Sequence, residues 1–200
     1  MRPTNIASIV VAAITGFIAV YATLTMRGNG ESQDQGRIEE KSKKIRADRL
    51  RAFIFHKDPK PVPEFTFTDV AGKTRSISEW RGKVVILNLW ATWCGPCREE
   101  MPSLDRLKSH FSNNEFDVVA ISLDRGGLAK VQNFYGEARI NKLDLYIDPT
   151  TKLMFKLKAV GLPATLLIDA NGREIGRIPG PAQWDGDLAI KMIKDALAKK

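Results

Sequence analysis

The stretch KVVILNLWATWCGPCR, residues 83–98, decides the fold. Residues 84–90 are apolar and rich in β-branched side chains, which is typical of a central strand buried on both faces. Pro96 suits the first turn of a helix, and the residues from 98 to 101 are good helix formers. Cys94 therefore lies where a strand passes into a helix.

A cysteine at such a junction is expected to be reactive. The free amides and the positive end of the dipole at a helix N-terminus favour a thiolate over a thiol, and they lower the pKa of a cysteine. Cys97 follows one helical turn later on the same side, so it can displace a substrate that Cys94 holds as a mixed disulfide. The sequence predicts that Cys94 attacks and Cys97 resolves.

The cysteine pair could instead form a structural staple or half of a zinc site. Cys94 and Cys97 are the only cysteines, and the two histidines, His56 and His110, are not spaced as a ligand pair. A disulfide that closes so short a loop would stabilise little. Two further roles stay open: a copper(I) carrier, because thiolates suit that ion, and a docking module with an incidental disulfide. We expect the helix to bury Cys97, which disfavours the carrier.

Residues 90–102, WATWCGPCREEMP, resemble the active-site segment of thioredoxin-like proteins. The resemblance is to the membrane-anchored periplasmic branch typified by TlpA and the cytochrome c maturation thioredoxins. It implies a thioredoxin-like α/β fold with a mostly parallel or mixed central sheet flanked by helices, an N-terminal β-hairpin and a central insertion between residues 123 and 143. It also implies no cofactor beyond a redox-active Cys94–Cys97 disulfide, in an active-site loop with Trp93, Gly95 and Pro96.

A second motif surrounds Pro163. A proline that opens a strand is weak evidence by itself. In the thioredoxin fold, however, the matching proline is cis and lies against the dithiol, so the resemblance implies a cis Leu162–Pro163 bond, which is rare in folded proteins. The backbone of Leu162 is then expected to bind an extended substrate segment through strand-like hydrogen bonds.

One residue departs from the thioredoxin pattern. Cytoplasmic thioredoxins have a buried aspartate in the strand before the motif, where this chain has Asn88. An amide cannot take the proton of Cys97, so another acid or water must serve. Asp124, at the end of the next predicted strand, is a possible proton acceptor. Its position also fits a loop or cap aspartate, which is the interpretation we favour.

The rest of the chain alternates strands and helices. We expect strands at 64–69, 74–77, 116–123, 143–147, 165–169 and 173–178, and helical segments at 99–111, 126–139, 150–158 and 185–199. Ser78 is expected to cap a short helical turn through Trp80. Such alternation implies a mostly parallel sheet covered on both faces.

The first 58 residues are expected to lie outside the globular domain. Residues 5–26 are uncharged and about long enough to span a bilayer, so residues 1–26 predict a transmembrane anchor, with a cleaved signal peptide as the alternative. Residues 27–58 indicate a polar tether and an amphipathic helix at 39–55, which packs on the domain or lies on a membrane face. Three prolines from Pro59 to Pro63 then mark the start of the thioredoxin-like domain, 59–200.

The net charge of +8 does not indicate nucleic-acid binding, because the basic residues form no stripe and alternate with no aromatic platform. Lysines and arginines crowd the downstream side of the anchor, and the positive-inside rule taken alone would favour a cytoplasmic domain. The resemblance implies the opposite orientation, with an anchor in the inner membrane and the catalytic domain in the periplasm.

The Gly-Pro pair between the cysteines resembles reducing rather than oxidising thioredoxins, so we expect a disulfide reductase. The resemblance implies that a membrane thiol reductase donates the electrons. It also implies that the substrates are periplasmic protein disulfides, in apocytochrome c or in copper-delivery proteins and the copper-binding subunit of cytochrome oxidase. The sequence does not choose between these substrates.

Overall fold

The computed structural model describes residues 35–199 except 39, 43, 46–48 and 112–113. The chain divides into two compact units, residues 1–44 and 45–200. The described residues of the first unit are helical. The predicted anchor at 1–26 and the start of the tether lie outside the described residues. No described helix is both long enough and apolar enough to cross a bilayer.

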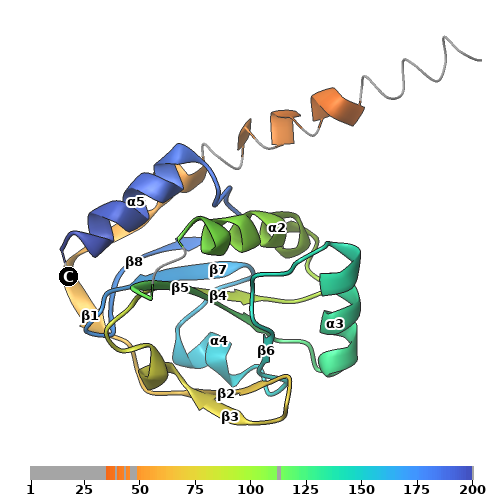
Figure 1. The fold of residues 1–200 in the computed structure, drawn as a ribbon, viewed down its shortest axis with the longest axis horizontal. Coiled ribbons are helices and arrows are strands. Elements are labelled where there is room, and N and C mark those ends of the chain that lie inside the picture. The colour runs from red at the N-terminus through yellow and green to blue at the C-terminus, as the bar shows by residue number, and fades with distance from the viewer. Residues whose placement is uncertain (1–34, 39, 43, 46–48, 112–113, 200) are drawn as a thin grey trace, which may run out of the picture. The chain divides into compact units, whose positions relative to one another are not determined.

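The second unit is built on one eight-stranded sheet in the order β1-β8-β7-β4-β5-β6-β2-β3 (Figure 1). The central strands β4, β5 and β6 are parallel, and every other pairing is antiparallel, so the sheet is mixed as expected. The strands are β1 (Ile54–Pro61), β2 (Thr66–Asp69), β3 (Thr74–Ser76), β4 (Val84–Trp90), β5 (Phe116–Ser122), β6 (Tyr146–Ile147), β7 (Ala164–Ile168) and β8 (Arg173–Pro179).

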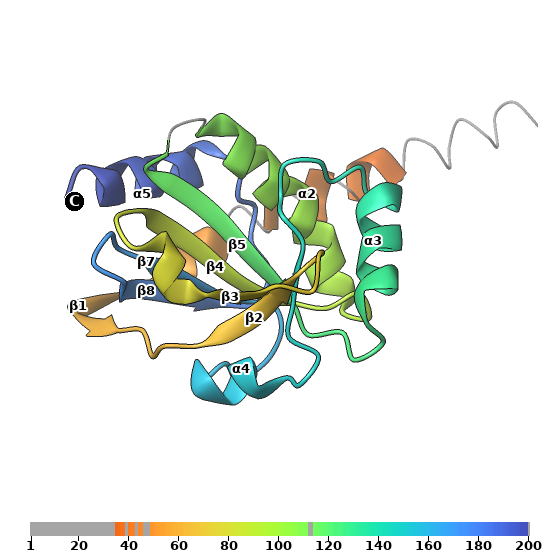
Figure 2. The same ribbon diagram turned by 60° about the horizontal axis from the view of Figure 1, so that its bottom comes forward.

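Helices cover both faces of this sheet (Figures 1 and 2). The helical elements are η1 (Leu50–Ala52), η2 (Ile77–Trp80), α2 (Gly95–His110), α3 (Leu128–Glu137), α4 (Lys152–Lys156) and α5 (Asp187–Leu197). One hydrophobic core joins α2, α3 and α5 to the sheet, and a second joins α4 and η2 to the opposite face. Every residue of β4 is buried, and its side chains contribute to both cores, which explains why all of them except Asn88 are apolar.

The N-terminal part of the sheet differs from the sequence prediction. The predicted helix does not continue to Phe55: a short 3₁₀ helix ends at Ala52, and β1 pairs antiparallel with β8 from Ile54 onward. The prolines of this segment are tolerated because β1 is an edge strand, where a missing N–H does not interrupt a ladder on both sides. The sheet therefore begins before residue 59.

Two smaller predictions were also wrong. The residue that caps η2 is Ser76 rather than Ser78: the Ser76 side chain accepts the amide of Ser78 at 3.2 Å, and Glu79 accepts the amide of Ser76 at 2.8 Å. Strand β6 is limited to Tyr146–Ile147 and does not begin at 143. The helix predicted at 99–111 is confirmed as α2, which runs from Gly95 to His110 and contains Pro102.

Candidate active site

The cysteine pair lies at one end of the central strands, which we call the dithiol edge. Because β4, β5 and β6 are parallel, the loops that follow them meet at this edge, and the antiparallel β7 begins there. Leu89 of β4 pairs with Ala164 of β7, so Pro163 lies beside the loop that carries Cys94. The topology thus brings together two motifs that are far apart in the sequence.

Cys94 and Cys97 form a disulfide, with their Cα atoms 5.2 Å apart. Cys94 is the N-cap residue of α2, and its Sγ accepts the backbone amide of Cys97 at 3.3 Å. An amide directed at this sulfur stabilises negative charge on it, which is the effect predicted for a helix start. Cys94 is 7% exposed, whereas Cys97 is completely buried. Of the two cysteines, Cys94 is therefore the one that reaches the surface.

The loop residues beside the cysteines form an exposed rim. Trp93 has 70% of its surface exposed, and Gly95 and Pro96 are also exposed. A large indole left in solvent next to a reactive sulfur is a suitable surface for a protein partner, because Trp combines a large apolar area with a polar N–H group.

The Leu162–Pro163 peptide bond is cis, as predicted. Pro163 is buried, and its carbonyl accepts the amide of Gly180 at 2.8 Å. Leu162 is half-buried, and its backbone makes no hydrogen bond to another described residue. Its amide and carbonyl are therefore available to an extended segment of another protein, as a strand-like contact requires.

Asp124 is buried beneath the active-site loop. Its carboxylate accepts the Thr92 amide at 2.8 Å, the Thr92 hydroxyl at 2.6 Å and the Ser122 hydroxyl at 2.7 Å. Three donors thus hold this carboxylate against the loop that precedes Cys94. By accepting both donors of Thr92, Asp124 fixes the active-site loop.

A buried carboxylate that the sequence analysis did not single out lies one helical turn after Cys97. Glu100 is completely buried, and its Oε1 accepts the side-chain amide of Asn88 at 2.8 Å. Its Oε2 accepts the amide of Ala182 at 2.9 Å and the indole N–H of Trp184 at 3.1 Å. Asn88 occupies the position where thioredoxins have a buried aspartate. In this chain Asn88 donates a hydrogen bond to the buried carboxylate, which belongs to Glu100.

The sequence contained a signal for Glu100. Cys97, Met101 and Leu104 are all buried, and Glu100 lies on the same face of α2 at helical spacing. A carboxylate among the apolar residues of a helix face has to be hydrogen-bonded, and it marks a site more often than a surface residue does. Helix propensity alone does not distinguish Glu100 from the neighbouring Glu99.

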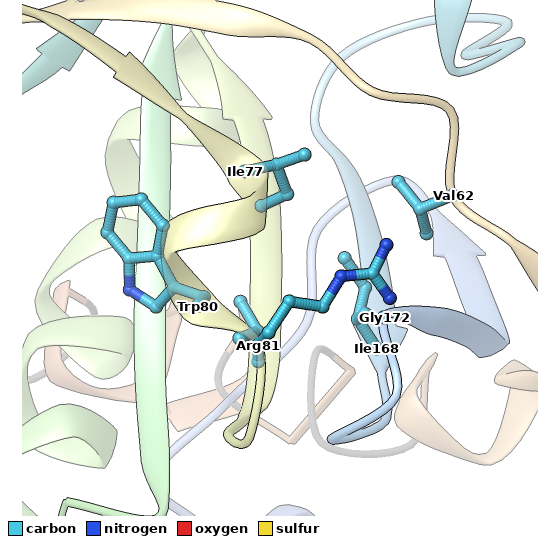
Figure 3. Close-up of a pocket in the computed structure, with 7 residues that line it drawn as sticks. Val62, Ile77, Trp80, Arg81, Ile168 and Gly172 are labelled. Atoms are coloured by element: carbon cyan, nitrogen blue, oxygen red, sulfur yellow. The ribbon is translucent and has the colours of Figure 1, made fainter.

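A small cavity at the opposite end of the sheet is not part of this site (Figure 3). It has a volume of about 10 Å³, barely room for one water molecule. Its lining is mostly apolar and consists of Val62, Ile77, Trp80, Arg81, Val85, Ile168 and Gly172. Among the described residues, no group of three or more His, Cys, Asp or Glu side chains is placed to hold a metal ion.

Comparisons with known proteins agree with this geometry. The redoxin family model matches residues 57–196. The thiol-disulfide oxidoreductase ResA of Bacillus cereus is 34% identical over 121 residues, which cover 60% of this chain and 69% of the relative. The Bacillus subtilis ResA is 30% identical over 119 residues, covering 60% and 65% of the two chains.

Solved structures show the same relationship. A thiol:disulfide interchange protein of the thioredoxin family from Chlorobium tepidum is 28% identical, with a TM-score of 0.58, and the match covers 71% of this chain and 99% of that one. The matches with ResA and with this structure point to one chemistry, the exchange of thiols and disulfides. The chain therefore belongs to the redoxin family, as a thioredoxin-like thiol-disulfide oxidoreductase of the TlpA and ResA type.

Proposed function

We propose that this protein is a membrane-anchored reductase of disulfides in periplasmic proteins, which we call its clients. One observation carries the assignment of roles: the Cys94 sulfur accepts the Cys97 amide and reaches the surface, while the Cys97 sulfur is buried behind it. The first sulfur is placed to attack a client, and the second can reach only the first.

The reaction begins with the reduced pair. The Cys94 thiolate attacks one sulfur of the client disulfide, the client S–S bond breaks, and the other client sulfur leaves as a thiolate that takes a proton. Cys97 then loses its proton and attacks the Cys94 sulfur, which releases the second client sulfur. Two electrons have moved to the client, and the Cys94–Cys97 disulfide remains, so no further cofactor is required.

Glu100 is the proton acceptor that we favour for Cys97. The two residues are three apart on one face of α2, so their side chains are neighbours. Both Cys97 and Glu100 are completely buried. Asp124, the acceptor suggested by sequence position, follows β5 and accepts from Thr92 and Ser122, whereas Glu100 is on the same helix face as Cys97. Its role in this proposal is to hold that loop.

Localisation and clients rest on the resemblance described above. Residues 1–26 anchor the protein in the inner membrane, the catalytic domain lies in the periplasm, and a membrane thiol reductase returns electrons to the disulfide. The clients are cysteine pairs of apocytochrome c, or of copper-delivery proteins and the copper-binding subunit of cytochrome oxidase. We do not advance the copper(I) carrier, because a carrier exposes both sulfurs and Cys97 is buried.

Insulin reduction tests the chemistry. The full-length chain in detergent micelles, reduced beforehand, should reduce insulin, and the Cys94→Ser variant should not. Equal rates for the two proteins would mean that the cysteine pair is incidental to a docking role.

Trapping tests the clients and the compartment. The Cys97→Ser variant cannot resolve the mixed disulfide, so in intact cells it should accumulate adducts through Cys94 with exported proteins that carry cysteine pairs. The variant lacking both cysteines is the control for non-covalent capture. If only cytosolic proteins were captured, the localisation and the clients proposed here would both be wrong.

A further inference from the structure

An arginine on β8 contacts the segment that leads to the cis proline. The Arg177 Nη1 atom donates to the carbonyl of Leu157 at 3.0 Å and to the carbonyl of Lys158 at 3.4 Å. These residues end α4, where the last carbonyls of a helix have no partner within it. A guanidinium supplies the missing donors and a favourable charge.

The contact is made at a turn with an unusual backbone. Lys158 has a φ of 52°, in the left-handed region that costs a side chain roughly 1–2 kcal/mol. The amides of Lys158 and Ala159 donate back to Phe155 and Met154 of α4. Arg177 thus binds the carbonyls of this turn, and the conformation of the turn sets the direction of residues 159–162.

The guanidinium is itself held in place. Both oxygens of the buried Glu174 accept from Arg177, each at 2.5 Å, and Glu174 also contacts His56 Nε2 at 2.7 Å. Burial alone would raise the pKa of Glu174, but hydrogen bonds from Arg177 and His56 outweigh it and hold that pKa below its usual value. The carboxylate therefore stays charged and fixes the orientation of the guanidinium fork.

This arrangement restrains one end of the client-binding segment. Residues 159–162 lie between the turn bound by Arg177 and Pro163, whose carbonyl is bound by Gly180. Between these two points the segment is open: Val160 is 91% exposed, and the backbone of Leu162 is unbonded within the described residues. The side chains of Ala159 and Leu162 pack against the core, and the contacts at the two ends add to this restraint on the segment.

We propose that Arg177, held by Glu174 and His56, is a positioning residue for client binding: it fixes the segment 157–162 so that Leu162 presents its backbone to an extended client strand. This rests on the proposed function, because it assigns the docking of the client and not the thiol chemistry. Arg177 touches neither cysteine in the structure, so its effect reaches the reaction through Leu162.

The test compares Arg177→Gln with Arg173→Gln in the full-length protein. Arg173 is the matched control, since it lies on the same strand and pairs with Asp169 at 2.8 Å at the other end of the sheet. Single-turnover oxidation of the reduced protein is followed with insulin and with bis(2-hydroxyethyl) disulfide, which is too small to use a strand-like contact. Amide hydrogen exchange of residues 159–162 is measured in the same proteins.

With insulin, Arg177→Gln should raise the half-saturating concentration about tenfold, the effect of losing one charge-assisted hydrogen bond, and leave the maximal rate unchanged. Its rate with the small disulfide should match that of the wild type. Exchange at 159–162 should become faster, Arg177→Lys should restore part of the insulin affinity, and Arg173→Gln should change none of these.

Two outcomes would overturn the proposal: no change in insulin saturation and hydrogen exchange, or an equal loss of rate with both substrates, which would place the effect at the dithiol. If Arg177→Gln does not fold, Arg177→Lys should show a smaller increase of the half-saturating insulin concentration and again no change with the small disulfide. A wild-type protein that reduces neither substrate would refute the proposed function instead, and hydrogen exchange would still report on the restraint.

Discussion

The two edges of the central sheet use charged side chains in opposite ways. At the edge that holds the β7–β8 turn, which we call the hairpin edge, charges pair where water reaches them: Asp169 with Arg173 at 2.8 Å, and Lys108 with Asp117 at 2.9 Å. At the dithiol edge, the carboxylates of Asp124 and Glu100 are buried and accept N–H and O–H donors.

The difference separates stability from access. Ion pairs at the hairpin edge link the elements that meet at that end of the sheet. Buried carboxylates at the dithiol edge hold the loops from below, so their outer surfaces stay free. Trp93, in the loop held by Asp124, is 70% exposed. At the dithiol edge, buried carboxylates fix the loops and leave their outer surface available to another protein.

The largest expected effect comes from Glu100→Gln. The amide keeps the shape of the side chain but cannot take a proton, so release of the client from the mixed disulfide should slow about 10²-fold or more. Alkylation of Cys94 at neutral pH should not change. Quenched-flow analysis of the mixed disulfide measures the first quantity, and Glu99→Gln on the same helix is the control. An unchanged release rate would assign the proton to water.

Asn88→Asp should weaken the fold. It would set two carboxyl groups in contact in a site without water access, and the loss at pH 7 should be about 3 kcal/mol in the free energy of unfolding. The folded protein tolerates the pair only while one of the two is protonated, so the loss of stability relative to the wild type should be smallest at low pH and grow as the pH rises. Urea unfolding at pH 5 and pH 7 measures this. Equal losses at the two pH values would contradict it.

The contrast between the edges is tested directly by two equivalent substitutions. Asp124→Asn leaves a buried donor of the active-site loop without an acceptor and should cost about 2 kcal/mol. Asp169→Asn weakens a partly exposed ion pair, its remaining side-chain oxygen can still accept the turn amides of Asn171 and Arg173, and it should cost about 0.5 kcal/mol. Thermal unfolding monitored by circular dichroism ranks them. Similar costs would mean that burial is not what distinguishes the edges.

Glu174 predicts a pH effect of the opposite sign to that of Asn88→Asp. Its pKa in the folded protein is lowered, so its contribution to stability is present above the pKa of an unfolded glutamate and is lost as the pH falls through the folded value. Glu174→Gln should therefore be less stable than the wild type by about 1 kcal/mol at pH 7. The two unfolding curves should converge in acid. A constant difference would show that the carboxylate is not charged in the folded state.

The smallest effect compares one backbone conformation at the two edges. Lys158 and Gly172 have φ values of 52° and 72°. Lys158→Gly should stabilise the protein by about 1 kcal/mol, because glycine adopts this region freely. Gly172→Ala should destabilise it, because a residue with a Cβ atom rarely adopts this backbone conformation. Chemical denaturation of both variants gives the signs.

The strand and helix around the cysteines could be predicted because their signals are local. An apolar run, a proline at a helix start and two cysteines three residues apart each have meaning within a short window. The cis bond at Pro163 followed from the resemblance and is confirmed. Its place beside the dithiol is set by the pairing of β4 with β7, which no local pattern encodes.

The errors arose where distant residues decide the structure. Phe53 and Ile54 fit an amphipathic helix, yet Ile54 pairs with Arg177, and His56 contacts Glu174, 118 residues away. Glu100 was missed for a similar reason: a glutamate in a helix indicates a site only once it is known which face is buried. Its partners Ala182 and Trp184 come from the far end of the chain.

The burial of Cys97 constrains how the protein works in sequence with others. Whatever returns electrons to the oxidised pair must also approach through Cys94, because that sulfur alone is within reach from outside. The electron donor and the client thus react at the same sulfur and cannot bind there at the same time. The cycle is expected to follow ping-pong kinetics, with each partner leaving before the next arrives, and an excess of either one should inhibit the other competitively.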